Sequence, residues 1–231
     1  MADSFQIDYH FEFTPALSRS FSISLDRSNL QVSPADVTTP PAWTALDFNC
    51  CPACRLDPQK YSECPVALNL VEVVETFKDF VSYDEVTVTV TTAERTYSKK
   101  CDLQTGLSPL LGIIMVASGC PTMDLLKPNV RFHLPFTSLE EMAYRSFTMY
   151  LLGQYYRQRQ GKEVDWSFAG FSSIFDQVTE LNSAFSERLL IAAKKDASIN
   201  ALVNLCCMGQ MSPGVIPGIL DEMEPYFSAY K

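Results

Sequence analysis

The sequence lacks the short motifs that mark the common enzyme classes. It contains no GxGxxG, no phosphate-binding P-loop, no HExxH and no GxSxG. These motifs are typical of dinucleotide binding, phosphate binding, zinc proteolysis and a serine nucleophile. Dehydrogenase, kinase and hydrolase functions therefore have no specific support, and we expect a protein without a catalytic residue.

Basic residues and long apolar runs are also scarce. There are 18 lysines and arginines against 27 aspartates and glutamates, which gives a net charge of -9. Nucleic acids and anionic membranes need a basic surface, so we expect neither as a partner. The most apolar stretch, residues 110–120, is about half as long as the roughly 20 residues that span a bilayer.

The first ten residues have neither the basic segment nor the apolar segment of a secretory signal. We therefore expect a cytoplasmic protein. Cysteines stay reduced in that compartment, so a cluster of them indicates a metal site or a reactive thiol site rather than a disulfide framework.

The residues that are present predict an α+β fold, with a small antiparallel sheet and one helix packed on a helical C-terminal part. The composition, 47% apolar and 12% aromatic, is that of a folded protein. Two-residue alternation predicts strands, and helical spacing of apolar residues predicts helices. The expected strands are residues 5–13, 20–26, 84–92 and 95–101, with a short one at 44–48, and the expected helices are 66–80, 109–118, 139–159, 171–192 and 199–206.

The character of the chain changes near residue 102. We expect residues 1–101 to form the sheet with one helix and to carry the cysteines, and residues 102–231 to form the helical part of one compact unit. The helix at 139–159 has apolar residues on most sides, so it is expected to be central and mostly buried. Ser212-Pro213 predicts a further helix start.

Four of the eight cysteines fall within residues 50–65. Cys51-Pro52-Ala53-Cys54 places two thiols on one tight turn, and Cys64-Pro65 opens the next helix. A cysteine before a proline at a helix start occupies the N-cap, where backbone N–H groups stabilise a thiolate.

The same arrangement recurs at Gly119-Cys120-Pro121, which makes Cys120 the preferred fourth ligand. Cys51, Cys54, Cys64 and Cys120 would complete a four-sulfur tetrahedron, with Cys50 and His133 as secondary candidates. Zinc and an iron–sulfur cluster both accept four thiolates. The repeated Cys-Pro pairs favour the cluster slightly, whereas structural zinc is the commoner occupant.

Two simpler interpretations remain open. Cysteine is often an inert, buried core residue, which is the expectation for Cys206 and Cys207. Alternatively, Cys51 and Cys54 form a redox-active pair of thiols. The leading hypothesis is a protein in which a four-cysteine zinc site joins the two parts of the chain. Its acidic surface would suit a protein partner. Its oligomeric state is not predicted.

Several of these motifs resemble an uncharacterised bacterial domain family of unknown function. The resemblance covers most of residues 46–160 and implies a bacterial, cytoplasmic protein, but it implies no activity. It rests on Cys51-Pro-Ala-Cys54, Cys64-Pro-Val-Ala67, Gly119-Cys120-Pro121, Arg131-Phe-His133-Leu-Pro-Phe136 and Tyr150-Leu-Leu-Gly-Gln154.

Two further groups have both a functional and a structural interpretation. His133 lies between apolar neighbours, which is more typical of a hydrogen-bonded core histidine than of a metal ligand or a general base. Glu140 and Glu141 precede Arg145 on the helix at 139–159. We interpret them as first-turn carboxylates favoured by the helix dipole, with an ordinary ion pair to Arg145.

Overall fold

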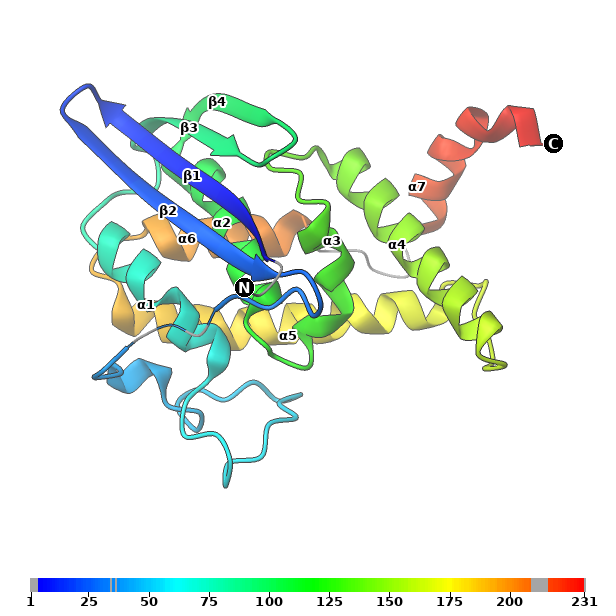
Figure 1. Cartoon of the computed structure of the whole chain (residues 1–231), viewed down its shortest axis with the longest axis horizontal. Coiled ribbons are helices and arrows are strands. Elements are labelled where there is room, and N and C mark those ends of the chain that lie inside the picture. The colour runs from blue at the N-terminus through cyan, green and yellow to red at the C-terminus, as the bar shows by residue number, and fades with distance from the viewer. Residues whose placement is uncertain (1–3, 34, 36, 209–215, 231) are drawn as a thin grey trace.

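The computed structural model describes residues 4–230 apart from 34, 36 and 209–215, and Figure 1 shows an antiparallel sheet lying over a set of helices. The strand order is β2-β1-β3-β4. The α+β fold class is therefore confirmed. The strands are β1 Ser4–Thr14, β2 Leu17–Asp26, β3 Glu85–Thr91 and β4 Thr96–Asp102.

The four longer predicted strands are confirmed within a few residues because alternation correctly identified the face that each strand buries. Ile7, Tyr9 and Phe11 of β1 are at most 1% exposed. The register pairs Tyr9 with Val90 and Phe11 with Val88, so apolar side chains of β1 and β3 gather on the face that meets the helices.

Most of the predicted helices are also present, with shifted ends. Ser212-Pro213, the predicted start of a further helix, lies outside the described residues. The helices are α1 Pro65–Phe77, α2 Leu103–Ala117, α3 Lys127–Arg131, α4 Leu139–Arg159, α5 Ala169–Ala192, α6 Ala197–Met208 and α7 Ile216–Met223, with short 3-10 turns at Ala42–Thr44, Met123–Leu126 and Glu224–Tyr230.

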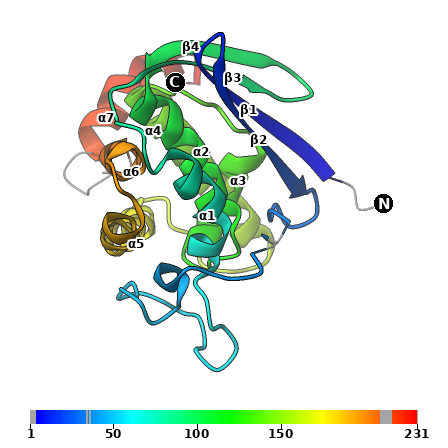
Figure 2. The same ribbon diagram turned by 90° about the vertical axis from the view of Figure 1, so that its left-hand side faces the viewer.

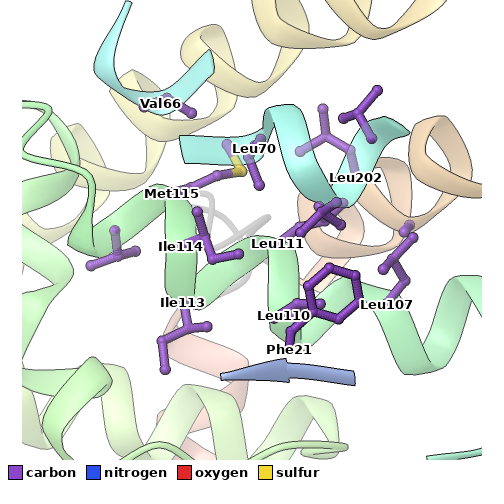
Figure 3. Close-up of a cluster of buried hydrophobic side chains, with 14 of the residues drawn as sticks. Phe21, Val66, Leu70, Leu107, Leu110, Leu111, Ile113, Ile114, Met115 and Leu202 are labelled. Carbon is purple, nitrogen blue, oxygen red and sulfur yellow. The ribbon is translucent and has the colours of Figure 1, made fainter. Parts of the chain in front are cut away.

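The central helix is α2, and the prediction that the helix at 139–159 would be central is wrong. Leu107, Leu110, Leu111 and Met115 of α2 have no exposed surface. Figure 3 shows α2 between α1, α6 and a strand of the sheet, with Phe21 on the strand side and Leu202 on the α6 side. A helix that is apolar all round is a buried helix.

In contrast, α4 lies at the edge of the molecule (Figure 1). Its sequence does contain many apolar side chains, but polar residues interrupt each stripe, so only one face is buried. Leu152 and Tyr156 are each 53% exposed, whereas Phe147 is 3% exposed.

Helix α2 begins six residues before the predicted start at Pro109, which instead lies inside the helix. The early start is possible because the first N–H groups have partners in the β3–β4 region. Asp102 accepts from the Thr105 N–H at 3.1 Å. The Leu103 and Gln104 N–H groups donate to the carbonyls of Asp84 and Ser82. Pro109 removes one helical hydrogen bond and crowds the carbonyl of Thr105, a cost that the burial of α2 offsets.

One apolar core joins the two sides of residue 102. It includes Phe11, Phe77 and Val88 from the first part and Leu107 and Leu202 from the second. A smaller core lies where α4, the first half of α5 and α7 meet, and it contains Phe147, Phe171 and Met223. None of the helices in the described ranges is long and apolar enough to cross a membrane.

A glycine permits the close approach of α2 to the sheet. A Cβ atom at Gly106 would lie 2.5 Å from Cγ2 of Val88, which is fully buried on β3. Real Cβ atoms do not come so close to another carbon, so any side chain at residue 106 would push α2 away from β3.

We predict that Gly106→Ala lowers the free energy of unfolding by about 1–3 kcal/mol, because overpacking exceeds the gain in helix propensity. The matched control is Gly153→Ala on α4, where a Cβ would meet nothing within 4 Å. That change should raise stability by about 0.5–1 kcal/mol. Chemical denaturation measures both, and equal effects at the two sites would contradict the packing argument.

Candidate metal centre

In the loop between β2 and α1, the segment just before the first cysteines pairs with the segment that ends at Cys64. Ala45 and Glu63 form an isolated antiparallel bridge. The Leu46 N–H donates to the Ser62 carbonyl, and the Cys64 N–H donates to the Thr44 carbonyl, each at 2.8 Å. These bonds return Cys64 to the base of the loop. Figures 1 and 2 show the loop lying beyond the start of α1 and beside α5.

The predicted strand at 44–48 is wrong. The segment starts as the 3-10 turn Ala42–Thr44 and makes only the single bridge at Ala45. The Thr44 hydroxyl donates to the Pro41 carbonyl at 2.7 Å, which stabilises a turn in place of an extended backbone.

Cys50, Cys51 and Cys54 lie on the predicted tight turn. The Cys54 N–H donates to the Cys51 carbonyl at 3.0 Å, which folds the two cysteines toward each other. Cys50 is exposed, whereas Cys51 and Cys54 are half-buried. The turn therefore presents Cys51 and Cys54 toward the protein more fully than it presents Cys50.

Cys64 is the N-cap residue of α1, with Pro65 in the first turn, as predicted. Its sulfur accepts no capping hydrogen bond from the first turn of the helix. Burial raises the pKa of Cys64, and the N–H groups of Ala67 and Val66 oppose that rise in part.

Cys120 follows Gly119, whose φ of +88° turns the chain sharply after α2. It heads the next turn, since its carbonyl accepts from the N–H groups of Met123 and Asp124 at 3.0 Å each. The N-cap of the following 3-10 turn is Thr122, so the prediction of Cys120 as N-cap is wrong by two residues. The N–H groups of Thr122 and Met123 still act to lower the pKa of its thiol.

Five cysteines line one small pocket of about 20 Å³. The loop contributes Cys50, Cys51 and Cys54, the start of α1 contributes Cys64, and the turn after α2 contributes Cys120. The far wall is Leu181, Phe185 and Arg188 of α5. All four preferred ligands thus face the same space, together with Cys50.

Within the described residues, no three histidine, cysteine, aspartate or glutamate side chains already stand in a metal-ligating arrangement. The five cysteines therefore line one pocket, but their sulfur atoms do not yet surround a common point. Cys101 lies elsewhere, beside Gly106. The side chains of Cys206 and Cys207 fall outside the described part, so their predicted place in the core stays a prediction.

Burial and mutual repulsion oppose ionisation of these thiols. Burial is the larger cause that raises the pKa of Cys51 to about 12, and the negative charge that Cys54 and Cys120 would carry adds to it. Burial likewise raises the pKa of Cys64 and of Cys120. Cys51, Cys64 and Cys120 are therefore neutral thiols at pH 7 unless a cation joins them.

Arg188 fixes the cysteine loop to α5, and the sequence interpretation did not single it out. It is 3% exposed, and its guanidinium donates to the carbonyls of Trp43, Ala45 and Leu46 at 2.8, 2.7 and 3.1 Å. A signal was present, because residue 188 follows Phe185 by three positions on the apolar stripe of α5. An arginine on a buried stripe needs acceptors, and loop carbonyls supply them.

His133 does not line the cysteine pocket. It lies half-buried against β1, where its Nε2 is hydrogen-bonded to the Tyr9 hydroxyl. Burial is the main cause that lowers its pKa to about 3, and the nearby positive charge of Arg145 contributes. His133 is thus a neutral, hydrogen-bonded core residue, and it borders a second, larger cavity.

The acidic pair at the start of α4 has a structural role. Ser138 and Glu141 form a capping box, with hydrogen bonds of 2.8 and 3.1 Å. The expected ion pair with Arg145 is wrong for the described part of the chain. Arg145 instead donates from Nη2 to the carbonyls of Asn129 and Phe132, at 3.1 and 2.9 Å.

We predict that Arg188→Met lowers the free energy of unfolding by about 2–4 kcal/mol, because three buried carbonyls lose a charged donor. Arg55→Met is the matched control. Arg55 also joins the loop to α5, through Gln177 at 2.7 Å, but it is exposed, so its loss should cost less than about 1 kcal/mol. Urea denaturation compares the two variants, and similar losses would show that Arg188 does not anchor the loop.

The comparisons with known proteins identify a family but no function. No curated protein and no solved structure matches the chain. A family model, described as a domain of unknown function (DUF6901), matches residues 7–228. The predicted resemblance to an uncharacterised domain family is confirmed, and the chain belongs to the DUF6901 family.

Proposed function

We propose that Cys51, Cys54, Cys64 and Cys120 hold a structural zinc ion that joins the loop before α1 to the end of α2. The observation that carries the proposal is the convergence of cysteines from three separate segments on one pocket wall. Residues this far apart in sequence share such a pocket only through the tertiary fold, so their meeting is not a consequence of the local cysteine motif.

The residues present suit zinc in number and in chemistry. Four thiolates form a common structural zinc site. A pocket of about 20 Å³ has room for one ion. The four thiols do not stand in a ligating arrangement, so binding requires their side chains to turn about the Cα–Cβ bonds.

The electrostatics favour a metal over a redox role. Redox-active cysteines have lowered pKa values, because the thiolate is the nucleophile. Here burial raises the pKa of Cys51 to about 12, which is the opposite shift. A bound divalent cation would reverse this effect by attracting the thiolates, and its chemistry there would be to cross-link them. A neutral thiol at Cys51 is a weaker nucleophile than a thiolate, and this favours the metal role over the redox role.

The site would act as a staple between parts that otherwise share few polar contacts. Arg188 holds one side of the loop through backbone carbonyls, while the cysteines lie further along the loop. Zinc would fix this second side by tying Cys51 and Cys54 to Cys120, which follows the central helix. Metal binding energy of this kind adds directly to folding free energy.

The stapled scaffold would serve protein interaction in the cytoplasm. The support is a group of exposed apolar and aromatic side chains on one side of α4, an arrangement that marks contact surfaces in folded proteins. The group consists of Tyr144, Leu152, Tyr155 and Tyr156, which are 47%, 53%, 47% and 53% exposed.

We predict that Cys54→Ser and Cys120→Ser each reduce bound zinc to less than about a tenth of one equivalent, because three thiolates bind structural zinc far more weakly than four. Elemental analysis of protein purified without chelators measures the metal. Cys101→Ser is the control, since Cys101 lies beside Gly106 and away from the pocket. It should retain about one equivalent.

These variants also distinguish a zinc site that includes Cys120 from one formed by the loop cysteines and Cys64 alone. If Cys120→Ser binds zinc as fully as the unchanged chain, the site does not include the turn after α2 and the staple is refuted. Iron and sulfide in a brown, anaerobically purified protein would instead establish an iron–sulfur cluster.

We predict that zinc affinity rises steeply with pH between about pH 5 and 8. Zinc binds thiolates, and the pKa values of Cys51, Cys64 and Cys120 are all raised in the metal-free chain, so binding must displace at least three protons. The association constant should therefore rise by about a factor of 10³ per pH unit. Competition with a chelator measures the slope, and a pH-independent affinity would exclude thiol ligands.

A further inference from the structure

A cavity of about 430 Å³ lies between α2, α3, α4, α5 and α6, apart from the cysteine pocket. Its size is that of pockets that bind small molecules. Most of its wall is apolar, so a ligand would bury hydrocarbon surface there. The apolar wall consists mainly of Ile113, Val116, Val130, Phe175, Val178 and Leu205.

The charge of the cavity wall is opposite to that of the whole chain. The net charge of the protein is -9, yet in the described part of the chain the charged residues on this wall are Lys99 and Arg145, with no aspartate or glutamate. His133, also on the wall, is neutral because burial lowers its pKa to about 3. Two cations on a wall whose described residues include no carboxylate favour an anionic ligand.

Arg145 is positioned to receive such an anion. It is half-buried, and burial is the main cause that lowers its pKa, while the nearby groups of Tyr97 and Glu141 oppose that shift in part. Both of its hydrogen bonds come from Nη2. Among the described residues, Nε and Nη1 have no acceptor, so the guanidinium keeps N–H groups that can each donate a charge-assisted hydrogen bond to a carboxylate.

Lys99 supplies the second cation from the sheet side. Its ammonium lies over the ring of Phe136, 5.8 Å from the ring centre. Phe136 has a φ of +61°, a left-handed conformation that costs a bulky residue energy and is often found at ligand sites.

A third polar group points to a hydrogen-bond donor on the ligand. Asn182 of α5 lines the cavity and is 2% exposed, yet in the described structure its Oδ1 has no hydrogen-bond partner. A buried amide oxygen without a donor destabilises a protein, so such a group is usually paired in the functional state. An incoming hydroxyl or amide N–H would satisfy it.

We propose that this cavity binds a medium-chain organic carboxylate whose apolar body also carries a hydroxyl or amide donor. The carboxylate lies between Arg145 and Lys99, the hydrocarbon chain fills the apolar space between α2 and α5, and the donor binds Oδ1 of Asn182. The proposal is independent of the zinc site, because none of Cys51, Cys54, Cys64 and Cys120 lines this cavity.

The test uses 3-hydroxydecanoate as the probe, below its micelle concentration, with isothermal titration calorimetry on the whole chain. We expect saturable binding at one site. Decanoate, which lacks the hydroxyl, should bind about three- to tenfold more weakly, and 1-decanol, which lacks the charge, at least tenfold more weakly. Absence of saturable binding, or equal binding of 1-decanol, would overturn the proposal.

Neighbouring residues of β4 provide a matched pair of charge variants. Lys99→Gln should weaken 3-hydroxydecanoate binding about three- to tenfold, since the cavity loses one of its two cations. Lys100 does not line the cavity and pairs with Glu85 at 3.1 Å, so Lys100→Gln should change binding less than about twofold. Equal effects would show that the attraction is only that of overall charge.

Asn182→Leu tests the hydroxyl contact with a variant that should fold. Removing a buried oxygen without a partner should raise the thermal midpoint of the ligand-free protein, while 3-hydroxydecanoate loses its advantage over decanoate. A lower midpoint together with an unchanged preference for the hydroxyl would mean that Asn182 serves the fold alone, and the proposed ligand would be wrong.

Discussion

The burial of α2 against the sheet is the constraint on which the rest of the structure depends. Gly106 lets α2 approach Val88 closely. This helix is apolar on all sides, so it packs against the sheet on one side and against α1 and α6 on the other. The two proposed sites lie on different parts of this helix. Its end carries the chain to Cys120, and its flank between Thr105 and Val116 forms a wall of the cavity.

A second helix, α5, separates the two sites while contributing to both. Leu181, Phe185 and Arg188 face the cysteines, whereas Phe175, Val178 and Asn182 face the cavity. The spacing of these residues places them on adjoining sides of one helix. Each site therefore has a rigid wall, and Arg188 fixes the loop of cysteines against that wall. A rigid support of this kind lets a loop present ligands at defined positions.

Prediction from sequence worked where a local pattern has one structural solution. Alternation in residues 5–13 and in residues 84–92 is typical of a half-buried strand, and the helix expected at 139–159 has those same bounds as α4. It was wrong about Pro109, because the early start of α2 depends on carbonyls of Asp84 and Ser82 that only the fold brings near. It also overestimated the burial of α4, since periodicity does not tell which apolar side chains find a partner.

The cysteine spacing and the proline that follows three of the cysteines indicated by themselves which residues could share a site, because a tight turn and an N-cap are local structures. Tertiary structure alone decided that the turn after α2 meets the loop before α1, that Arg188 supports that loop, and that Asn182 and Arg145 border one cavity. The physical reason is that each of these contacts joins residues from separate elements. The way α2 and α5 pack in the core decides how far apart those residues lie. No pattern along the chain records which buried faces will meet.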